Sequence, residues 1–276
     1  MYNTTQSMTK QMIVAENVVK KFGDIAAVDG ISFTVKKGEI FAFLGPNGAG
    51  KSTTIKMLTT MLRPTEGKLI LADHDVTKER ASARKAFGIV FQDPSLDEEL
   101  SAYENMELHA ILYGVPKATR AKQIQELLEL VELWNRKDSM IKTFSGGMRR
   151  RLEIARGLLH EPKILFLDEP TLGLDTQTRN LMWNYVKKLS DEKGMTIFFT
   201  THYLDEAEAV AERIAIIDHG KIVATGTTAE LCKLTKTKSL EDAYLKLTGS
   251  GARDDAESGD NNGLNFKLSL RNTRLR

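Results

Sequence analysis

The chain contains 276 residues, of which 41% are hydrophobic and 28% charged, a composition typical of a soluble globular protein. Its 39 basic and 37 acidic residues leave a formal net charge of +2, so the basic field expected of a nucleic-acid-binding protein is absent. The one cysteine, Cys232, excludes an intrachain disulfide, and no apolar run approaches the roughly 20 residues that span a bilayer.

The first folded elements are predicted to be strands. Residues 1–12 are polar, lack the apolar core of a secretory signal and are expected to be a tail. Ile13–Thr34 is predicted to form two strands around a turn, because apolar and polar residues alternate around Phe33. A short apolar strand is predicted at Glu39–Leu44, and a helix at Ser52–Leu62, which stops before a proline.

The middle of the chain is predicted to combine helices with a parallel sheet. The pattern from Gln92 to about His160 is mainly helical. Ile164–Leu167 and Ile197–Thr200 are apolar strands separated by a helix, Gln177–Leu189. Strands that are apolar throughout and alternate with helices indicate a parallel sheet covered on both faces.

The last predicted folded element is a hairpin. Ile214–Ile217 and Ile222–Ala224 flank a turn at His219–Gly220. From Gly249 the composition changes to glycine, serine, aspartate and asparagine. We therefore expect residues 250–276 to form a disordered C-terminal tail.

A glycine-rich loop carries the clearest chemical signal. It matches the pattern G-x-x-x-x-G-K-S/T and stands between a strand and a helix, as a phosphate-binding loop requires. Its glycines let backbone N–H groups surround phosphate oxygens, and the helix directs its positive end at them. The alternative is an ordinary glycine-rich turn. The predicted nucleotide-binding residues are Gly45, Pro46, Asn47, Gly48, Ala49, Gly50, Lys51, Ser52 and Thr53.

Two carboxylates end the apolar strand Ile164–Leu167. Such a strand delivers Asp168 and Glu169 to the edge of the sheet, where open α/β folds bind ligands. Asp168 is predicted to hold Mg²⁺ together with the Ser52 hydroxyl. Glu169 is predicted to polarise the attacking water as a general base. The alternative is a solvated strand end.

A second glycine-led helix start follows Phe144. Ser145, Gly146 and Gly147 precede a helical pattern, so free N–H groups and the helix dipole would form another anion site. Taken alone the signal is weak, because glycines before a helix also ease packing. With one phosphate-binding loop already in the chain, it predicts a second phosphate-binding element.

Taken together, these motifs resemble the ATPases of ABC transporters. Phe144–Met148 resembles the family's signature motif, and it falls between the phosphate-binding loop and Asp168–Glu169 as that family requires. Gln92 resembles the Q-loop glutamine, Asp175 the D-loop aspartate and His202 the switch histidine. The likeness covers roughly residues 13–249. It implies an α/β fold: a P-loop NTPase (RecA-like) core with an N-terminal antiparallel β-subdomain and an inserted helical subdomain at about 92–160.

The resemblance also implies residue roles. Gln92 and His202 would join Glu169 as catalytic residues, and Gln92 would also join the metal ligands. Phe22 resembles the aromatic residue that stacks on adenine. Each assignment has a simpler alternative: Gln92 as a surface glutamine, His202 as a strand-end cap, and Phe22 as a core residue.

Residues 145–152 and 240–249 narrow the resemblance to type-2 ABC exporters of the daunorubicin-resistance kind. This kind implies export of a drug-like, lipid-like or glycan substrate. Departures from the general family pattern include Phe144 for leucine, Met148 for glutamine, Gly173 in the D-loop and Phe22 for tyrosine. None removes a predicted phosphate contact or metal ligand.

The family implies a head-to-tail homodimer that binds ATP and Mg²⁺. Ser145, Gly146 and Gly147 of one copy would face the phosphate-binding loop of the other. The partner would be an integral membrane permease on a separate chain, and the ATPase would lie at the cytoplasmic face of the cell membrane without binding nucleic acid.

Rival functions remain open from the sequence. A non-transport ABC ATPase acting on ribosomes or nucleic acid usually has two ATPase halves or a long coiled coil, and this chain shows neither. A GTPase needs an N-K-x-D motif, and the nearest string, residues 135–138, has the wrong order. A small-molecule kinase would not need the Ser145–Gly147 element.

Overall fold

The computed structural model describes residues 10–249 of the chain. The predicted C-terminal tail, residues 250–276, lies outside the described residues, as do residues 1–9 of the predicted N-terminal tail. Within residues 10–249, no helix combines the length and apolar character needed to cross a membrane.

An antiparallel sheet of four strands has the order β2-β1-β4-β5. β1 (Gln11–Phe22) and β2 (Ile25–Lys36) form the predicted hairpin, and the alternation around Phe33 is confirmed by its burial on one face. β4 (Glu66–Leu71) and β5 (His74–Asp75) were not predicted from the sequence. The first half of β4 is polar and exposed and lacks the hydrophobic alternation of a half-buried strand. β4 is a strand because its backbone pairs with β1.

A second sheet of six strands has the order β10-β9-β3-β8-β7-β6. Neighbours from β9 through β6 run parallel, which confirms the predicted parallel sheet, and β10 returns antiparallel along β9 as the predicted hairpin. The strands are β3 (Ile40–Leu44), β6 (Phe87–Val90), β7 (Ile164–Asp168), β8 (Thr196–Thr201), β9 (Arg213–Asp218) and β10 (Lys221–Gly226).

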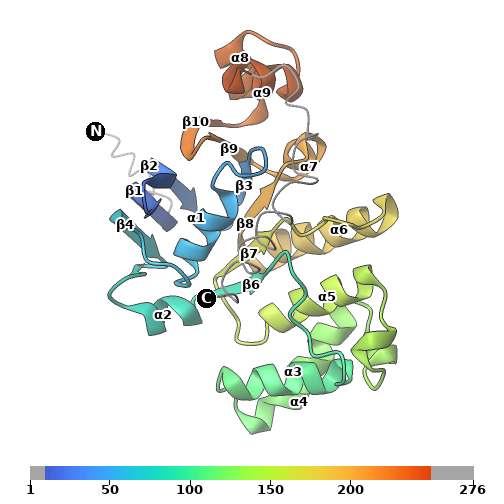
Figure 1. The fold of residues 1–276 in the computed structure, drawn as a ribbon. Coiled ribbons are helices and arrows are strands. Elements are labelled where there is room, and N and C mark those ends of the chain that lie inside the picture. Colours follow the sequence, from blue (N-terminus) through green and yellow to red (C-terminus); the bar gives the residue numbers. More distant parts are fainter. Residues whose placement is uncertain (1–9, 250–276) are drawn as a thin grey trace, which may run out of the picture.

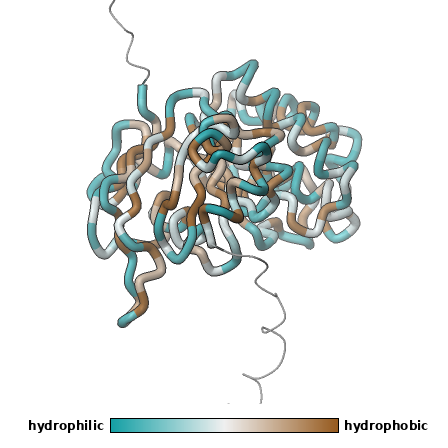
Figure 2. The backbone as a smooth tube through the Cα atoms, turned by 90° about the horizontal axis from the view of Figure 1, so that it is seen from above, coloured by the Kyte–Doolittle hydropathy of each residue, from teal (hydrophilic) through white to brown (hydrophobic). Residues whose placement is uncertain are grey.

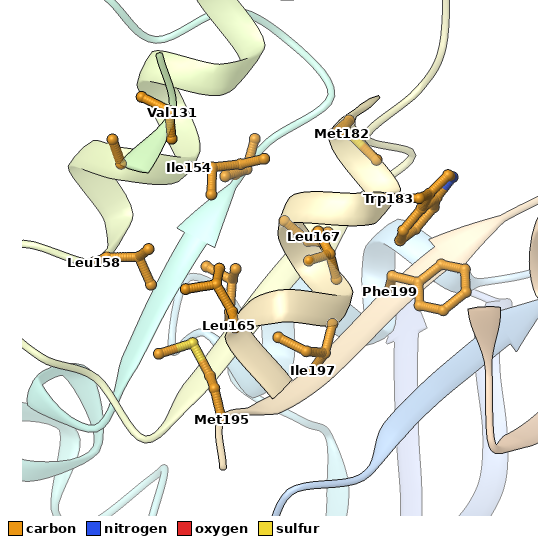
Figure 3. Close-up of a cluster of buried hydrophobic side chains, with 14 of the residues drawn as sticks. Val131, Ile154, Leu158, Leu165, Leu167, Met182, Trp183, Met195, Ile197 and Phe199 are labelled. Carbon is orange, nitrogen blue, oxygen red and sulfur yellow. The ribbon is translucent and has the colours of Figure 1, made fainter. Parts of the chain in front are cut away.

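Both faces of the parallel sheet are covered. Along β7, Leu165 and Leu167 belong to a core shared with helices, whereas Ile164 and Phe166 belong to a core shared with the antiparallel sheet. Figure 3 shows the helical side, where Leu165 and Leu167 meet side chains such as Leu158. Figure 2 shows that the hydrophobic segments run through the interior and that hydrophilic turns lie at the margin. The alternation therefore makes one sheet the middle layer of the molecule.

Residues 10–249 also contain nine α-helices and two short 3₁₀ helices, of which α8 and α9 follow the last strand. Helices α3, α4 and α5 group together at one end of the molecule (Figure 1). The bounds are α1 (Lys51–Leu58), α2 (Arg80–Lys85), α3 (Ala102–Leu112), α4 (Lys117–Leu130), η1 (Trp134–Arg136), η2 (Ile141–Thr143), α5 (Gly146–Gly157), α6 (Thr176–Lys193), α7 (Leu204–Val210), α8 (Thr228–Thr235) and α9 (Leu240–Thr248).

Some predicted helix ends were wrong. The helix predicted to reach Leu62 ends at Leu58, because the chain turns at Thr59 and continues through Thr60, whose φ of 63° is left-handed. The helix predicted to end at Leu189 continues to Lys193 and stops at Gly194, whose φ of 59° suits a glycine cap. The predicted helical stretch from Gln92 begins as a loop, and its first helix starts at Ala102 behind the Ser101 capping box.

Candidate functional site

The glycine-rich loop links β3 to α1 and lies too close to its neighbours for side chains at two glycines. A Cβ on Gly45 would stand 2.3 Å from the carbonyl oxygen of Ile217, at the end of β9. A Cβ on Gly50 would stand 2.5 Å from the carbonyl oxygen of Ala27, and Gly50 has a φ of 106°. Only glycine satisfies both demands, so tertiary contacts as well as the motif require these residues.

An open pocket of about 420 Å³ lies at the carboxyl edge of the parallel sheet. Its walls come from five places: the glycine-rich loop with α1, Ala27 on β2, the segment after β6, the segment after β7 and the segment after β8. The structure thus brings together Gln92, Glu169 and His202 beside the loop. The lining residues are Ala27, Asn47, Gly48, Gly50, Lys51, Ser52, Thr53, Gln92, Glu169, Leu172 and His202.

Lys51 stands at the base of this pocket and is only 4% exposed. Its Nζ donates to the carbonyl oxygens of Gly45, at 2.8 Å, and Pro46, at 3.1 Å. It also forms an ion pair with Glu169, with 3.1 Å between Nζ and Oε1. The loop's own backbone therefore fixes the ammonium beside the predicted base.

Asp168 is held by two hydroxyl groups. Its Oδ1 accepts hydrogen bonds from Thr200 Oγ1 at 2.6 Å and from Ser52 Oγ at 3.3 Å. Burial raises the pKa of the Asp168 carboxyl above its ordinary value of 3.8, and the Thr200 hydrogen bond opposes that rise only in part. A hydroxyl, a carboxylate and the nearby Gln92 amide offer the oxygen ligands that suit Mg²⁺.

Glu169 and His202 meet directly, although 33 positions separate them. His202 Nδ1 lies 2.8 Å from Glu169 Oε2. The backbone of Glu169 has a φ of 45°, which is uncommon for a non-glycine residue, and its N–H donates to Thr200 Oγ1 at 3.0 Å. His202 thus lines the pocket in contact with the Glu169 carboxylate.

The signature-like residues lie elsewhere. Ser145 caps α5, with its Oγ accepting from Met148 N at 3.3 Å, and α5 covers the helical face of the sheet rather than the α1 face. Asp175 caps α6 and accepts from Thr178 N at 2.9 Å. A Cβ on Gly147 would lie 2.2 Å from Thr178 Cγ2. These residues therefore adjoin one another but do not line their own chain's pocket.

Phe22 ends β1 and is 49% exposed, so the alternative that it is a core residue is wrong. The Nζ of Lys20 lies 5.1 Å from its ring centroid. Ala27, on the adjoining strand β2, lines the pocket. The ring is therefore available to a ligand.

Two residues that were not predicted from the sequence organise the site. Thr200 contacts both Asp168 and Glu169, as described above. Glu206 is buried on α7 and accepts hydrogen bonds from the hydroxyls of Thr171 and Thr201. The only sequence signal was the position of each residue near His202.

An Asp168→Asn variant tests the cost of burying this carboxylate. Because the folded pKa is raised, the folded state binds more protons than the unfolded state, and stability falls as pH rises from the ordinary value of 3.8 through the raised folded value. At neutral pH without Mg²⁺, we expect Asp168→Asn to melt a few degrees above wild type. The gap should shrink as pH approaches 4, in melting scans with EDTA. A variant that melts lower at every pH would contradict this account.

Comparison with known proteins places the pocket in context. Residues 28–172 match the family model described as ABC transporter. The linearmycin resistance ATP-binding protein of Bacillus subtilis is 42% identical over 243 residues, covering 88% of this chain and 76% of that protein. The daunorubicin/doxorubicin resistance ATP-binding protein of Streptomyces peucetius is 44% identical over 246 residues, covering 89% and 73%. A dimeric ATP-binding cassette solved in a post-hydrolysis state with ADP and Pi is 31% identical with a TM-score of 0.71, covering 78% of this chain and 98% of that one.

Proposed function

Because the chain belongs to the ABC transporter family, it is an ATP-binding ATPase subunit, and we propose that it drives an exporter through a permease on a separate polypeptide. The observation that carries the proposal is the pocket in which Lys51, Glu169 and His202 are bonded in series beside the glycine-rich loop. The relatives named for drug resistance support the export direction. A role on ribosomes or nucleic acid is not favoured by these relatives.

In this proposal the loop holds the triphosphate and Glu169 accepts a proton from the attacking water. The ion pair with Lys51 keeps the Glu169 carboxylate occupied; phosphate oxygens compete for the ammonium and so free the carboxylate for water. His202 orients the carboxylate through its other oxygen. Ser52, Gln92 and Asp168 would hold Mg²⁺, which supplies charge neutralisation at the phosphates when bound. Phe22 offers its exposed ring to the adenine.

We further propose that two copies pair head to tail. Ser145, Gly146 and Gly147 start α5 with unused backbone donors, and they do not line the pocket of their own chain. A second copy's triphosphate satisfies those donors, as the dimeric state of a related cassette supports. Asp175 caps α6 beside them, so it would lie at the same interface.

The permease contact is proposed at the end of α3. Leu108, Ile111 and Leu112 are exposed there, and Leu112 reaches 73% exposure. Exposed apolar clusters of this kind mark protein interaction sites. The placement also joins the permease to the helical group that contains α5 (Figure 1), and it implies a peripheral position at the cytoplasmic face of the membrane.

A paired substitution tests this contact. We expect Ile111→Glu/Leu112→Glu to lose co-purification with the co-expressed permease by about tenfold or more, because two charges would be buried at the interface. Soluble ATP turnover should stay at the wild-type rate. The control is Leu234→Glu on α8, which is 66% exposed and should not affect co-purification. Equal retention by both variants would exclude α3 as the docking site.

A further inference from the structure

The segment between β6 and α3 has little regular structure of its own, yet its backbone is well bonded. Gln92, which lines the pocket, stands near its start. Buried backbone groups need partners, and outside helices and sheets these must come from side chains or water. For the first half of the segment, from Phe91 to Ser95, these partners are charged side chains of α5.

Arg150 binds the start of this segment. Its guanidinium donates to the carbonyl oxygen of Phe91 and, from Nη2, to the carbonyl oxygen of Gln92 at 3.1 Å. It also donates from Nη1 to Glu153 Oε2 at 3.0 Å. Arg150 is 7% exposed and Glu153 is 2% exposed, so water does little to screen the pair.

Glu153 binds the segment three residues further on. Its Oε1 accepts from the backbone N–H of Ser95 at 2.8 Å and from the Ser95 hydroxyl at 3.2 Å. Arg156, one turn along the same helix, donates from Nη1 to the carbonyl oxygen of Ser95 at 2.6 Å. One face of α5 thus bonds to both ends of the stretch from Phe91 to Ser95.

Burying two charged side chains costs free energy of desolvation, which is offset only by a close ion pair with further hydrogen bonds. Apolar residues would fill the space between α5 and β6 at lower cost, but they could not bond to carbonyl and N–H groups of the segment. The bonds hold the main chain at Phe91, at Gln92 itself and again at Ser95, three residues further on. The arrangement therefore sets a position and does more than fill a core.

We propose that Arg150 and Glu153 are positioning residues that hold Gln92 in the ATP pocket, so that α5 controls one oxygen ligand of Mg²⁺. The inference rests on the proposed function, because it takes the pocket to be the Mg²⁺–ATP site. Since Ser145 caps α5, the helix that would meet the second copy's triphosphate at its start also positions the glutamine of its own chain's site. In the dimer, α5 would therefore contribute to both ATP sites, to one through its start and to the other through Arg150 and Glu153.

The test compares Arg150→Met with Arg151→Met in the full-length chain. Arg151 is the adjacent arginine, and its guanidinium bonds to the carbonyl oxygen of Val131 rather than to the segment that contains Gln92. We expect Arg150→Met to raise the free Mg²⁺ concentration for half-maximal ATP turnover by about tenfold, as loss of one charge-assisted hydrogen bond predicts. Arg151→Met should keep the wild-type value. A purely structural effect would lower the amount of active protein without shifting the Mg²⁺ requirement.

A second readout does not depend on turnover. Mn²⁺ binding in the presence of a non-hydrolysable ATP analogue, followed by electron paramagnetic resonance, should weaken by a similar factor in Arg150→Met and remain unchanged in Arg151→Met. Arg150→Lys should give an intermediate value, because one ammonium cannot span both carbonyls as the planar guanidinium does. If Arg150→Met does not fold, Glu153→Gln decides the question on the same two measurements.

Unchanged Mg²⁺ and Mn²⁺ requirements in folded Arg150→Met and Glu153→Gln would overturn the inference. Equal shifts in Arg150→Met and Arg151→Met would do so too, because they would report a general loosening of α5. Absence of ATP turnover in the wild type would instead contradict the proposed function, and the Mn²⁺ comparison would still decide the role of Arg150.

Discussion

Glu169→Gln is expected to bind ATP with wild-type affinity and to hydrolyse it about 10²- to 10⁴-fold more slowly, the usual contribution of a positioned base. Glutamine keeps the shape and one acceptor oxygen for Lys51, but its amide cannot take a proton from water. The remaining hydrogen bond to His202 preserves the position of the side chain. Phosphate release gives the rate, and equilibrium binding of a fluorescent ATP analogue gives the affinity.

The matched control is Glu208→Gln, the same substitution on exposed α7 surface. Its turnover should equal that of the wild type. A Glu169→Gln variant that hydrolyses ATP at the wild-type rate would remove Glu169 from the role of base. A loss of affinity equal to the loss of rate would instead assign it to ground-state binding.

Lys51→Met is expected to weaken ATP binding by about 10- to 150-fold, the range for losing a hydrogen bond to a charged group. Lys51 is anchored by two carbonyl oxygens of the loop, so its ammonium is pre-positioned and no other side chain replaces it. The measurement is isothermal titration with ATP and Mg²⁺. Lys56→Met, at an exposed position of the same helix, is the control and should bind as the wild type does.

An affinity for ATP in Lys51→Met within twofold of wild type would place the triphosphate elsewhere. Without nucleotide, Lys51→Met also leaves the Glu169 carboxylate without the ammonium that pairs with it. The melting temperature of the variant should therefore be measured alongside its ATP affinity. A folded variant with weak binding supports the assignment.

The buried strands could be predicted from sequence because their surroundings leave little choice of residue. β3, β7 and β8 are central and covered on both faces, so they read as continuous apolar runs. β6 lies at the edge of the same sheet and was missed. It is four residues long, and its Gly88 allows close contact with α5, where a Cβ would lie 2.2 Å from the carbonyl oxygen of Gly157.

The residues of the site likewise divide into those that the sequence predicted and those that it did not. The loop, Asp168–Glu169 and His202 follow strands directly, so motif and strand order together predicted that they would meet at one edge. Thr200 and Glu206 act through contacts that exist only after β7, β8 and α7 are assembled, and nothing local in the sequence marks them. Likewise Arg150 appears as one of three consecutive arginines, and only the structure separates it from its neighbours.

The central claim is that a triphosphate joins two copies of this chain. Sedimentation velocity of Glu169→Gln, with ATP and Mg²⁺ or with ADP and Mg²⁺, tests it most directly, because slow hydrolysis preserves the ATP state. The account predicts a dimer with ATP and a monomer with ADP, and a monomer in both when Gly146→Asp is added to place a negative charge at the α5 terminus, where a Cβ would have 3.8 Å of room. A monomer with ATP, or a dimer that persists with ADP, would contradict it.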